Sequence, residues 1–258
     1  MKHLGVELWK RKALIWNFAL SDLKLKYKNS MLGFTWTFLE PLLMLAVLYV
    51  VFTNITSSNI EHFGLYLLLG IILWNLLSRG NESSLSSFLI RSNILKQVYF
   101  PKEILAISST LTAFLMTLFE LIVFGIFIVI FQFTPTITIV LLIPILILEF
   151  ILVLGLNFAL GVLNVVYRDI KFIWKIVLQA GFFLTPIFYD FNILPQEVQN
   201  ILKYSPTVQI LNMAHDVTLY NKIPSLETII LAILTISIIF VVGYSIHYKI
   251  KDRVIEEL

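Results

Sequence analysis

The stretch Tyr27–Leu43, YKNSMLGFTWTFLEPLL, decides how this chain folds, because a lysine-rich approach turns there into a continuous apolar run. Gly33 permits a tight turn at the start of that run. Glu40 and Pro41 fall inside it, and a proline cannot donate to the carbonyl of Thr37, so we expect a kink or break at this point. The stretch therefore predicts a basic surface helix, a turn and an interrupted membrane span.

The composition supports a membrane protein. The hydrophobic fraction is 59% and the mean hydropathy is +0.90, whereas soluble domains are about 45–50% apolar. The absence of cysteine excludes disulfides, thiolate metal sites and cysteine nucleophiles. Residues 1–33 contain no apolar core of a signal peptide, so we expect no cleavable leader. We expect one transmembrane domain over residues 1–258, made of an interface helix (1–33), a bundle (34–248) and a tail (249–258).

The hydropathy pattern predicts an all-α integral membrane protein with six spans, since a bilayer core needs about 20 apolar residues per helix. The predicted spans are Phe34–Thr53, Phe63–Ser78, Ile104–Phe131, Ile137–Val166, Phe172–Ile187 and Leu226–Tyr248. The second and fifth are short for a straight crossing, and irregular backbone shielded by protein would have to complete them.

The positive charges are strongly asymmetric with respect to these spans. Of the 19 lysines and arginines, 17 fall in residues 1–33, 79–103, 167–175 and the C-terminal tail. Only Lys203 and Lys222 fall on the other side. The positive-inside rule then places both termini in the cytoplasm and supports an even number of spans.

Residues 4–28 have the periodicity of a helix. Its apolar stripe consists of Trp9, Ala13, Trp16, Leu20, Leu23 and Tyr27. A basic amphipathic helix with tryptophans on its apolar side lies flat among lipid headgroups. One interpretation is a plain membrane anchor. The other is that Lys24, Lys26 and Lys28 also bind an anionic lipid headgroup at the cytoplasmic rim.

Polar residues in the predicted spans admit two interpretations as well. Glu40 should face protein or a watery cavity, because a carboxylate at the centre of a span costs about 2.5–3.5 kcal/mol. The aromatic stripe of the first span is either packing or a channel lining. In the third and fourth spans, polar residues occupy single faces: Ser108, Thr112, Glu120, Glu149, Asn157, Gly161, Asn164 and Arg168. Gly155 and Ala159 favour close helix packing. We favour interhelical hydrogen bonding over a proton relay through Glu120 and Glu149.

Two connecting segments suggest further roles. Residues 92–99, SNILKQVY, are expected to form a short helix that ends before Pro101, and their apolar side chains suggest a docking surface for a partner. Between the fifth and sixth predicted spans, Pro195 and Pro206 each precede a short apolar segment, which we interpret as re-entrant or interfacial helices at the outer mouth. The chain contains neither a P-loop nor a catalytic constellation, so we expect no enzyme activity, no cofactor and no metal in this chain.

Four segments resemble the membrane subunit of ATP-binding-cassette (ABC) exporters of bacterial surface polysaccharides. They are Asp22–Trp36 with Glu40–Leu42, Lys96–Glu103, Tyr167–Lys171 and Phe182–Tyr189, and they follow the family's order over nearly the whole chain. The O-antigen export permeases are the most similar group, and teichoic-acid and capsule exporters are related to them.

The resemblance implies a homodimer of six-helix subunits in the bacterial inner membrane, paired with two copies of a cytoplasmic ATPase that binds ATP and Mg²⁺. It implies export of a polymer attached to undecaprenyl pyrophosphate, with no nucleic acid involved. Its coupling helix corresponds to Ser92, Asn93, Ile94, Leu95, Lys96, Gln97, Val98 and Tyr99. The expected substrate contacts are Lys24, Lys26, Lys28, Phe34, Phe38, Glu40, Tyr49, Phe182, Phe183 and Tyr189.

Alternatives remain open at this stage. Fold does not determine substrate, so an ABC exporter of teichoic acid, capsule, lipid or drug has the same pattern. An ion-coupled secondary transporter that uses Glu120 and Glu149 is a second class, although the chain shows no inverted repeat that would support it. A membrane-embedded enzyme is the third.

Overall fold

The structure, a computed structural model, describes residues 2–28, 30–56, 60–98 and 100–257, and in these ranges all regular elements are helices. In chain order they are α1 (Lys2–Lys10), α2 (Lys12–Lys26), η1 (Gly33–Thr35), α3 (Trp36–Thr56), α4 (Phe63–Ile90), α5 (Ser92–Gln97), α6 (Glu103–Ile130), η2 (Ile137–Leu141), α7 (Leu142–Val166), α8 (Ile170–Leu184), η3 (Phe191–Ile193), α9 (Gln196–Leu202), α10 (Pro206–Thr218), α11 (Leu226–Ile250) and α12 (Val254–Glu257).

Five segments of the described chain are long and apolar enough to cross a membrane. They are Gly33–Thr53, Phe63–Ile90, Glu103–Ile130, Ile137–Val166 and Leu226–Ile250. The predicted fifth span corresponds to α8, which has 15 residues. At 1.5 Å per residue α8 is about 22 Å long, shorter than the ~30 Å hydrocarbon core. The structure thus supports a multi-span helical protein, and α8 is too short to be counted among the five candidate spans of the described chain.

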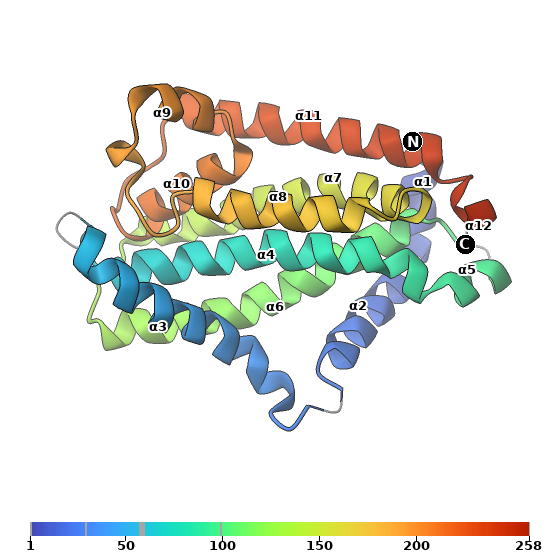
Figure 1. Ribbon diagram of the computed structural model, residues 1–258, viewed down its shortest axis with the longest axis horizontal. Helices are drawn as coiled ribbons and strands as arrows, with labels where there is room; N and C mark the ends of the chain where they lie inside the picture. The colour runs from blue at the N-terminus through green and yellow to red at the C-terminus, as the bar shows by residue number, and fades with distance from the viewer. Residues whose placement is uncertain (1, 29, 57–59, 99, 258) are drawn as a thin grey trace.

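Helix α4 forms the axis of the bundle, with α6 and α7 packed along it and α3 and α8 on its outer flanks (Figure 1). Its apolar side chains, such as Leu68 and Leu69, are fully buried. Polar groups join the three central helices as well. Asn157 of α7 donates to the Thr110 hydroxyl of α6 at 2.8 Å, and Asn164 donates to the Leu85 carbonyl of α4 at 2.7 Å. These contacts support the hydrogen-bonding interpretation of the polar faces.

Close packing of α7 against α11 depends on two glycines. A Cβ atom on Gly243 would lie 1.9 Å from the carbonyl oxygen of Gly155, and a Cβ on Gly155 would lie 2.8 Å from the Cα of Phe240. Neither contact is possible for a real side chain, so the two backbones touch only because both positions are glycine. The predicted close approach at Gly155 is confirmed.

The predicted second span was wrong in length. Helix α4 continues from Phe63 through Ser78 to Ile90, so residues 79–90 are helix rather than a cytoplasmic loop. The polar residues that ended the predicted span lie inside the bundle: Arg79, Asn81, Ser84 and Ser87 are all buried. Two of them have partners on neighbouring helices, since Arg79 pairs with Glu120 of α6 and Ser84 donates to the Asn157 carbonyl of α7 at 3.1 Å.

The first span also differs from the prediction. Helix α3 runs without interruption through Pro41, so the expected break is absent. Pro41 has no N–H to donate to the Thr37 carbonyl, so the helix continues there with one intrahelical hydrogen bond missing. The predicted turn is confirmed, since Gly33 adopts a φ of +51°.

The N-terminal segment forms two helices, α1 and α2, which meet at Arg11. The predicted stripe remains largely on the surface, with Trp9 71% and Trp16 46% exposed. A different face of α2 packs on α6: Ala19 is fully buried, and its carbonyl accepts a hydrogen bond from Thr112 at 3.2 Å. Helix α2 therefore carries an exposed apolar stripe and a second face that contacts the bundle.

Both expected short helices occur between α8 and α11. Helix α9 follows Pro195 and is largely exposed, whereas α10 begins at Pro206 and packs against α4, α7 and α11. Most of α10 is buried. Helix α10 is thus packed into the bundle, whereas α9 lies on its surface. It lies with α9 at the end opposite α5 and the C-terminus (Figure 1).

Candidate functional site

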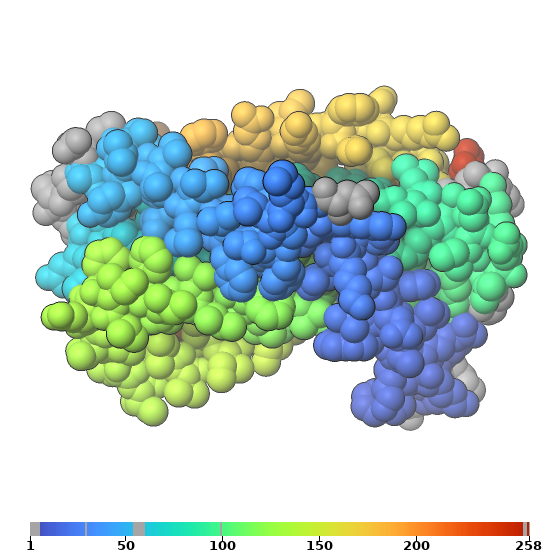
Figure 2. Space-filling model, turned by 90° about the horizontal axis from the view of Figure 1, so that it is seen from below, coloured from blue at the N-terminus to red at the C-terminus, as the bar shows by residue number. Residues whose placement is uncertain are grey.

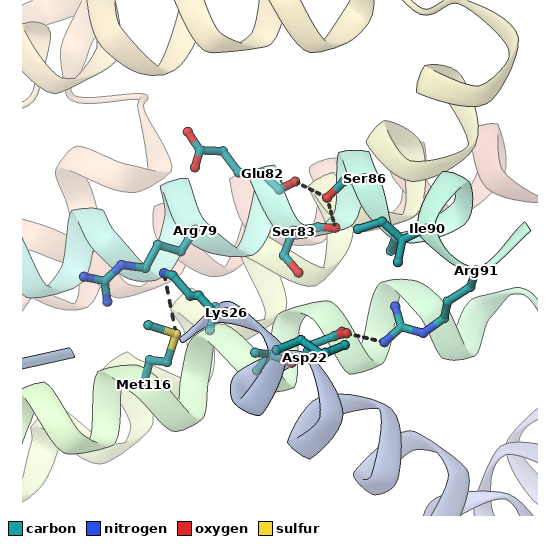
Figure 3. A pocket seen from close by; sticks show the side chains of 13 residues that line it. Asp22, Lys26, Arg79, Glu82, Ser83, Ser86, Ile90, Arg91 and Met116 are labelled. Carbon is teal, nitrogen blue, oxygen red and sulfur yellow. Dashed lines mark hydrogen bonds and ion pairs between the residues drawn. The ribbon is translucent and has the colours of Figure 1, made fainter. Parts of the chain in front are cut away.

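A cavity of about 400 Å³ lies between α2, α4 and α6, near the end of the bundle that carries α5. Figure 3 shows Asp22 and Lys26 of α2 near Arg79 of α4 and Arg91, which follows α4, with Met116 of α6 below. The serines of α4 complete one wall, namely Ser83, Ser86 and Ser87. The cavity thus brings together charged residues from sequence segments more than fifty positions apart.

Arg79 connects three helices. Its guanidinium lies 3.0 Å from the Glu40 carboxylate of α3 and forms a hydrogen-bonded ion pair with Glu120 of α6. Glu120 is fully buried, whereas the Glu40 side chain is 52% exposed. One arginine therefore has a buried partner in the central bundle and a half-exposed partner on the peripheral first span. The expectation that Glu40 faces protein is confirmed.

The three lysines proposed as headgroup contacts do not converge. Lys24 and Lys28 are exposed and do not line the cavity. Lys26, although exposed overall, directs its ammonium group toward the cavity, 3.9 Å from the sulfur of Met116 (Figure 3). Burial lowers the pKa of Lys26, and the charge of Arg79 lowers it further. Of the three lysines, Lys26 is the one placed to contact a molecule in the cavity.

Arg91 joins the end of α4 to the start of α5 and is buried. Its guanidinium forms an ion pair with Asp22 of α2 and lies 4.6 Å from the ring centroid of Phe18. The Phe18 ring also meets Phe100, which follows α5, in an edge-to-face contact at 5.8 Å. Burial raises the pKa of Asp22, and Arg91 opposes that shift. We call Phe18, Asp22 and Arg91 the clamp, because they fasten both ends of α5 to α2.

Helix α5 is the segment expected to dock a partner, and the structure places it at one end of the bundle (Figure 1). Leu95 points inward and is buried. Ile94 and Val98 are 42% and 56% exposed. Three other members, Asn93, Lys96 and Gln97, are exposed and Ser92 is half-buried, while Tyr99 lies outside the described residues. The helix therefore presents apolar side chains beside polar ones on an accessible surface.

A second cavity, of about 480 Å³, lies between α3, α4 and α8. Met44 and Leu48 of α3 face Phe182 and Phe183 of α8 across Trp74 of α4, and Glu82, Gln179 and Lys175 supply polar groups. Glu82 also lines the first cavity. The two cavities therefore border the same residue of α4, one on each side of it.

The expected aromatic lining is divided among three places. Phe34 and Phe38 pack edge-to-face on Phe119 of α6, at 4.9 and 6.4 Å between ring centroids. Tyr49 lines an apolar cavity with Phe127 and Phe131. Phe182 and Phe183 line the α3–α8 cavity. The Tyr189 hydroxyl donates to the carbonyls of Phe183 and Leu184, at the end of α8.

Sequence reasoning did not single out Arg79, Arg91, Asp22 or Phe18 as site residues. A charged residue inside an apolar helix is a signal for functional or paired groups, and this signal was available at Arg79 and Glu120. Their partnership spans 41 positions, and the Asp22–Arg91 partnership spans 69. Pairing at such separations cannot be derived from helical periodicity.

The fold and these sites define a class: a multi-pass helical membrane protein with a charged cavity at one end and an exposed docking helix beside it. Residues 13–219 match the ABC-2 type transporter family, and the chain belongs to that family. It is a transporter permease subunit, the membrane component of an ABC exporter.

Two relatives illustrate the similarity. The O-antigen export system permease protein RfbA of Klebsiella pneumoniae is 29% identical over 238 residues, which cover 92% of each chain. The protein of the same name from Myxococcus xanthus is 27% identical over 244 residues, covering 93% of this chain and 92% of the relative.

Proposed function

We propose that this chain is the transmembrane subunit of an ABC exporter that moves a polysaccharide linked to undecaprenyl pyrophosphate, such as O-antigen, across the bacterial inner membrane. The observation that carries the proposal is the similarity to O-antigen export permeases over about nine tenths of the chain. Export of teichoic acid, capsule, lipid or drug by a related exporter is the alternative within the same class.

The proposed topology has six crossings with both termini in the cytoplasm. Helix α8 is the fifth crossing, and the irregular residues 185–188 that follow it are buried, so protein shields their backbone. The asymmetric lysines and arginines orient the chain with α5 on the cytoplasmic side. The end that carries α9 and α10 is then the outer end.

Energy in this proposal comes from a separate ATPase, two copies of which bind ATP and Mg²⁺ and dock on α5. Ile94 and Val98 would enter a groove of that partner. The functional unit is a homodimer of the permease, because α3 and α8 leave most of their surfaces exposed: only Leu178 is buried in α8. Two such flanks facing each other would enclose a conduit that a single copy leaves open.

The substrate's phosphate-bearing end would reach the first cavity beside Lys26, where each lysine near the surface attracts an anion by about 1 kcal/mol. Movement of the ATPase would displace α5, and the clamp would transmit this displacement to α2 and thus to the cavity wall. The glycan would then pass along the aromatic side chains of α3 and α8.

Co-purification with the ATPase tests the coupling part of the proposal. Replacing Ile94→Ser together with Val98→Ser should remove the ATPase from the purified complex, because both side chains are exposed on α5. The matched control is Ile201→Ser with Ile223→Ser, which are 73% and 74% exposed elsewhere. ATPase retention by the α5 variant at the control level would reject α5 as the docking element.

Glycan export tests the substrate part. Lys24→Gln, Lys26→Gln and Lys28→Gln together should abolish export while leaving the complex assembled. Lys26→Gln alone should account for most of the loss, since its ammonium group is the one in the cavity. Lys10→Gln with Lys12→Gln serves as the control for the same N-terminal segment. Unchanged export by the triple variant would reject the headgroup role.

A further inference from the structure

The proposed outer end of the bundle contains another cavity, of about 390 Å³, whose lining is mainly polar. It lies where α10 meets the start of α4 and the segment after α8. Its polar lining includes Asp190, Asn192, Asn212, Asp216, Tyr220 and Lys222. Sites for small ligands commonly measure about 300–1,000 Å³, so this cavity has room for one or two sugar units.

Helix α10 supplies two polar side chains to this cavity. Between Val208 and Leu219, Asn212 and Asp216 are the two residues that are not buried. They are four residues apart and so share one face of α10. In the described parts of the chain neither side chain forms a hydrogen bond or an ion pair within 4 Å, although Lys222 acts on Asp216 electrostatically, and both side chains line the cavity. An amide and a carboxylate are therefore left with free donors and acceptors toward the cavity.

The base of the cavity is rigid. The His215 ring stacks on the Tyr66 ring at 3.7 Å between centroids, and its Nε2 lies 3.1 Å from the Tyr66 carbonyl oxygen. The Tyr66 hydroxyl donates to the carbonyls of Pro186 and Tyr189 at 2.8 and 2.9 Å. These contacts fix α10 to α4 and to the segment that follows α8, so the polar groups above them are preorganised.

The lining also indicates what kind of ligand fits. Two carboxylates, Asp190 and Asp216, line the cavity with one ammonium group, that of Lys222, whose charge acts on Asp216 without an ion pair within 4 Å in the described residues. The Asp190 carboxylate already accepts hydrogen bonds from the backbone and side-chain N–H groups of Asn192, both at 2.9 Å. This excess of negative charge disfavours phosphates and uronic acids. Carboxylates and amides offer the acceptors and donors that neighbouring hydroxyl groups require, and Tyr220, 39% exposed, offers an aromatic face beside a polar tip. Uncharged sugars carry both neighbouring hydroxyl groups and an apolar ring face, so they fit this lining.

We propose that this cavity binds one or two uncharged sugar units of the exported glycan at the outer end of the conduit. The inference rests on the proposed function, because a glycan reaches this end only if the protein exports one. Bound there, the leading part of the glycan is held outside while the permease resets.

Binding can be measured on the purified permease–ATPase complex in lipid nanodiscs, without sugar-based detergents. The probe is the glycan released from its lipid carrier by mild acid and dephosphorylated. Asn212→Ala with Asp216→Ala should weaken binding at least tenfold, and Asp216→Asn, which keeps the shape, should weaken it less. The matched control is Glu197→Ala with Asn200→Ala, an exposed carboxylate and amide on α9, and binding should stay within twofold of the unaltered complex.

ATP-driven export by the same complexes distinguishes a failure of the outer sugar site from a failure of the proposed export function. Suppose that the unaltered complex exports glycan and that the Asn212/Asp216 double variant keeps its melting temperature. If this variant nevertheless binds the probe as tightly as the control does, the outer sugar site is overturned and the proposed function remains. A complex that exports no glycan overturns the proposed function itself. Export with the expected loss of probe binding supports both.

Discussion

The first span, Gly33–Thr53, which contains most of α3, and the second, α4, are both apolar enough to cross a membrane, yet 17% of the most apolar stretch of the first is buried against 83% of that of α4. Hydropathy thus identifies both as spans but does not distinguish a central helix from a peripheral one. Figure 2 shows α3 lying across the surface of the molecule with α6 beside it. Helix α4 holds the bundle together, whereas α3 packs on its flank and leaves most of its surface exposed.

Core truncation should distinguish the two helices most clearly. Leu68 of α4 is fully buried and Val50 of α3 is 72% exposed. Leu68→Ala should destabilise the permease by about 2–5 kcal/mol because it leaves a cavity, while Val50→Ala should change stability by less than about 0.5 kcal/mol. Thermal unfolding of the purified permease measures both. Equal losses would contradict the division into a central and a peripheral helix.

The two ion-pair partners of Arg79 allow the same comparison between a central helix and the peripheral helix α3. Glu120→Gln removes its buried partner and should cost about 3–5 kcal/mol, because part of a buried charge loses its compensation. Glu40→Gln removes the half-exposed partner on α3 and should cost less than about 1 kcal/mol. Urea or thermal unfolding gives both values. A larger loss for Glu40→Gln would mean that α3 is as firmly held as the central helices.

The clamp should affect coupling as well as stability, because Asp22→Asn leaves the buried Arg91 without its ion-pair partner. Asp22→Asn and Arg91→Lys should each lower the glycan exported per ATP hydrolysed about three- to tenfold, since α5 then moves without α2. The exchange Asp22→Arg with Arg91→Asp should restore part of the ratio. Export and ATP hydrolysis are measured on the same preparation. If both activities fall in proportion and the exchange restores nothing, the clamp is structural only.

Much of this architecture can be predicted from sequence, because long apolar runs and the placement of lysines follow directly from the cost of burying charge in lipid. The short helix α5 was predicted for a similar reason, as apolar residues in a polar connection followed by Pro101. The continuation of α4 past Ser78 was not predicted. In the sequence Arg79 is typical of the start of a loop, and only the structure shows that Glu120 lies beside it.

The charged sites were the least predictable part. The notion that three lysines act together came from their proximity in sequence, yet only Lys26 directs its charged group into the cavity. The predicted stripe of α2 was real but outward-facing, and the face that contacts α6 contains Ala19 and Asp22, which the apolar pattern omits. Periodicity indicates which residues share a face, and packing decides what that face contacts.

The central claim is that an ATPase drives this permease, and transport in proteoliposomes tests it most directly. Permease and ATPase are reconstituted with fluorescent lipid-linked glycan and with ionophores that dissipate proton and sodium gradients. The account predicts that ATP moves the glycan across the bilayer under these conditions and that the permease alone does not. Transport by the permease alone, driven by a proton or sodium gradient without ATP, would contradict it.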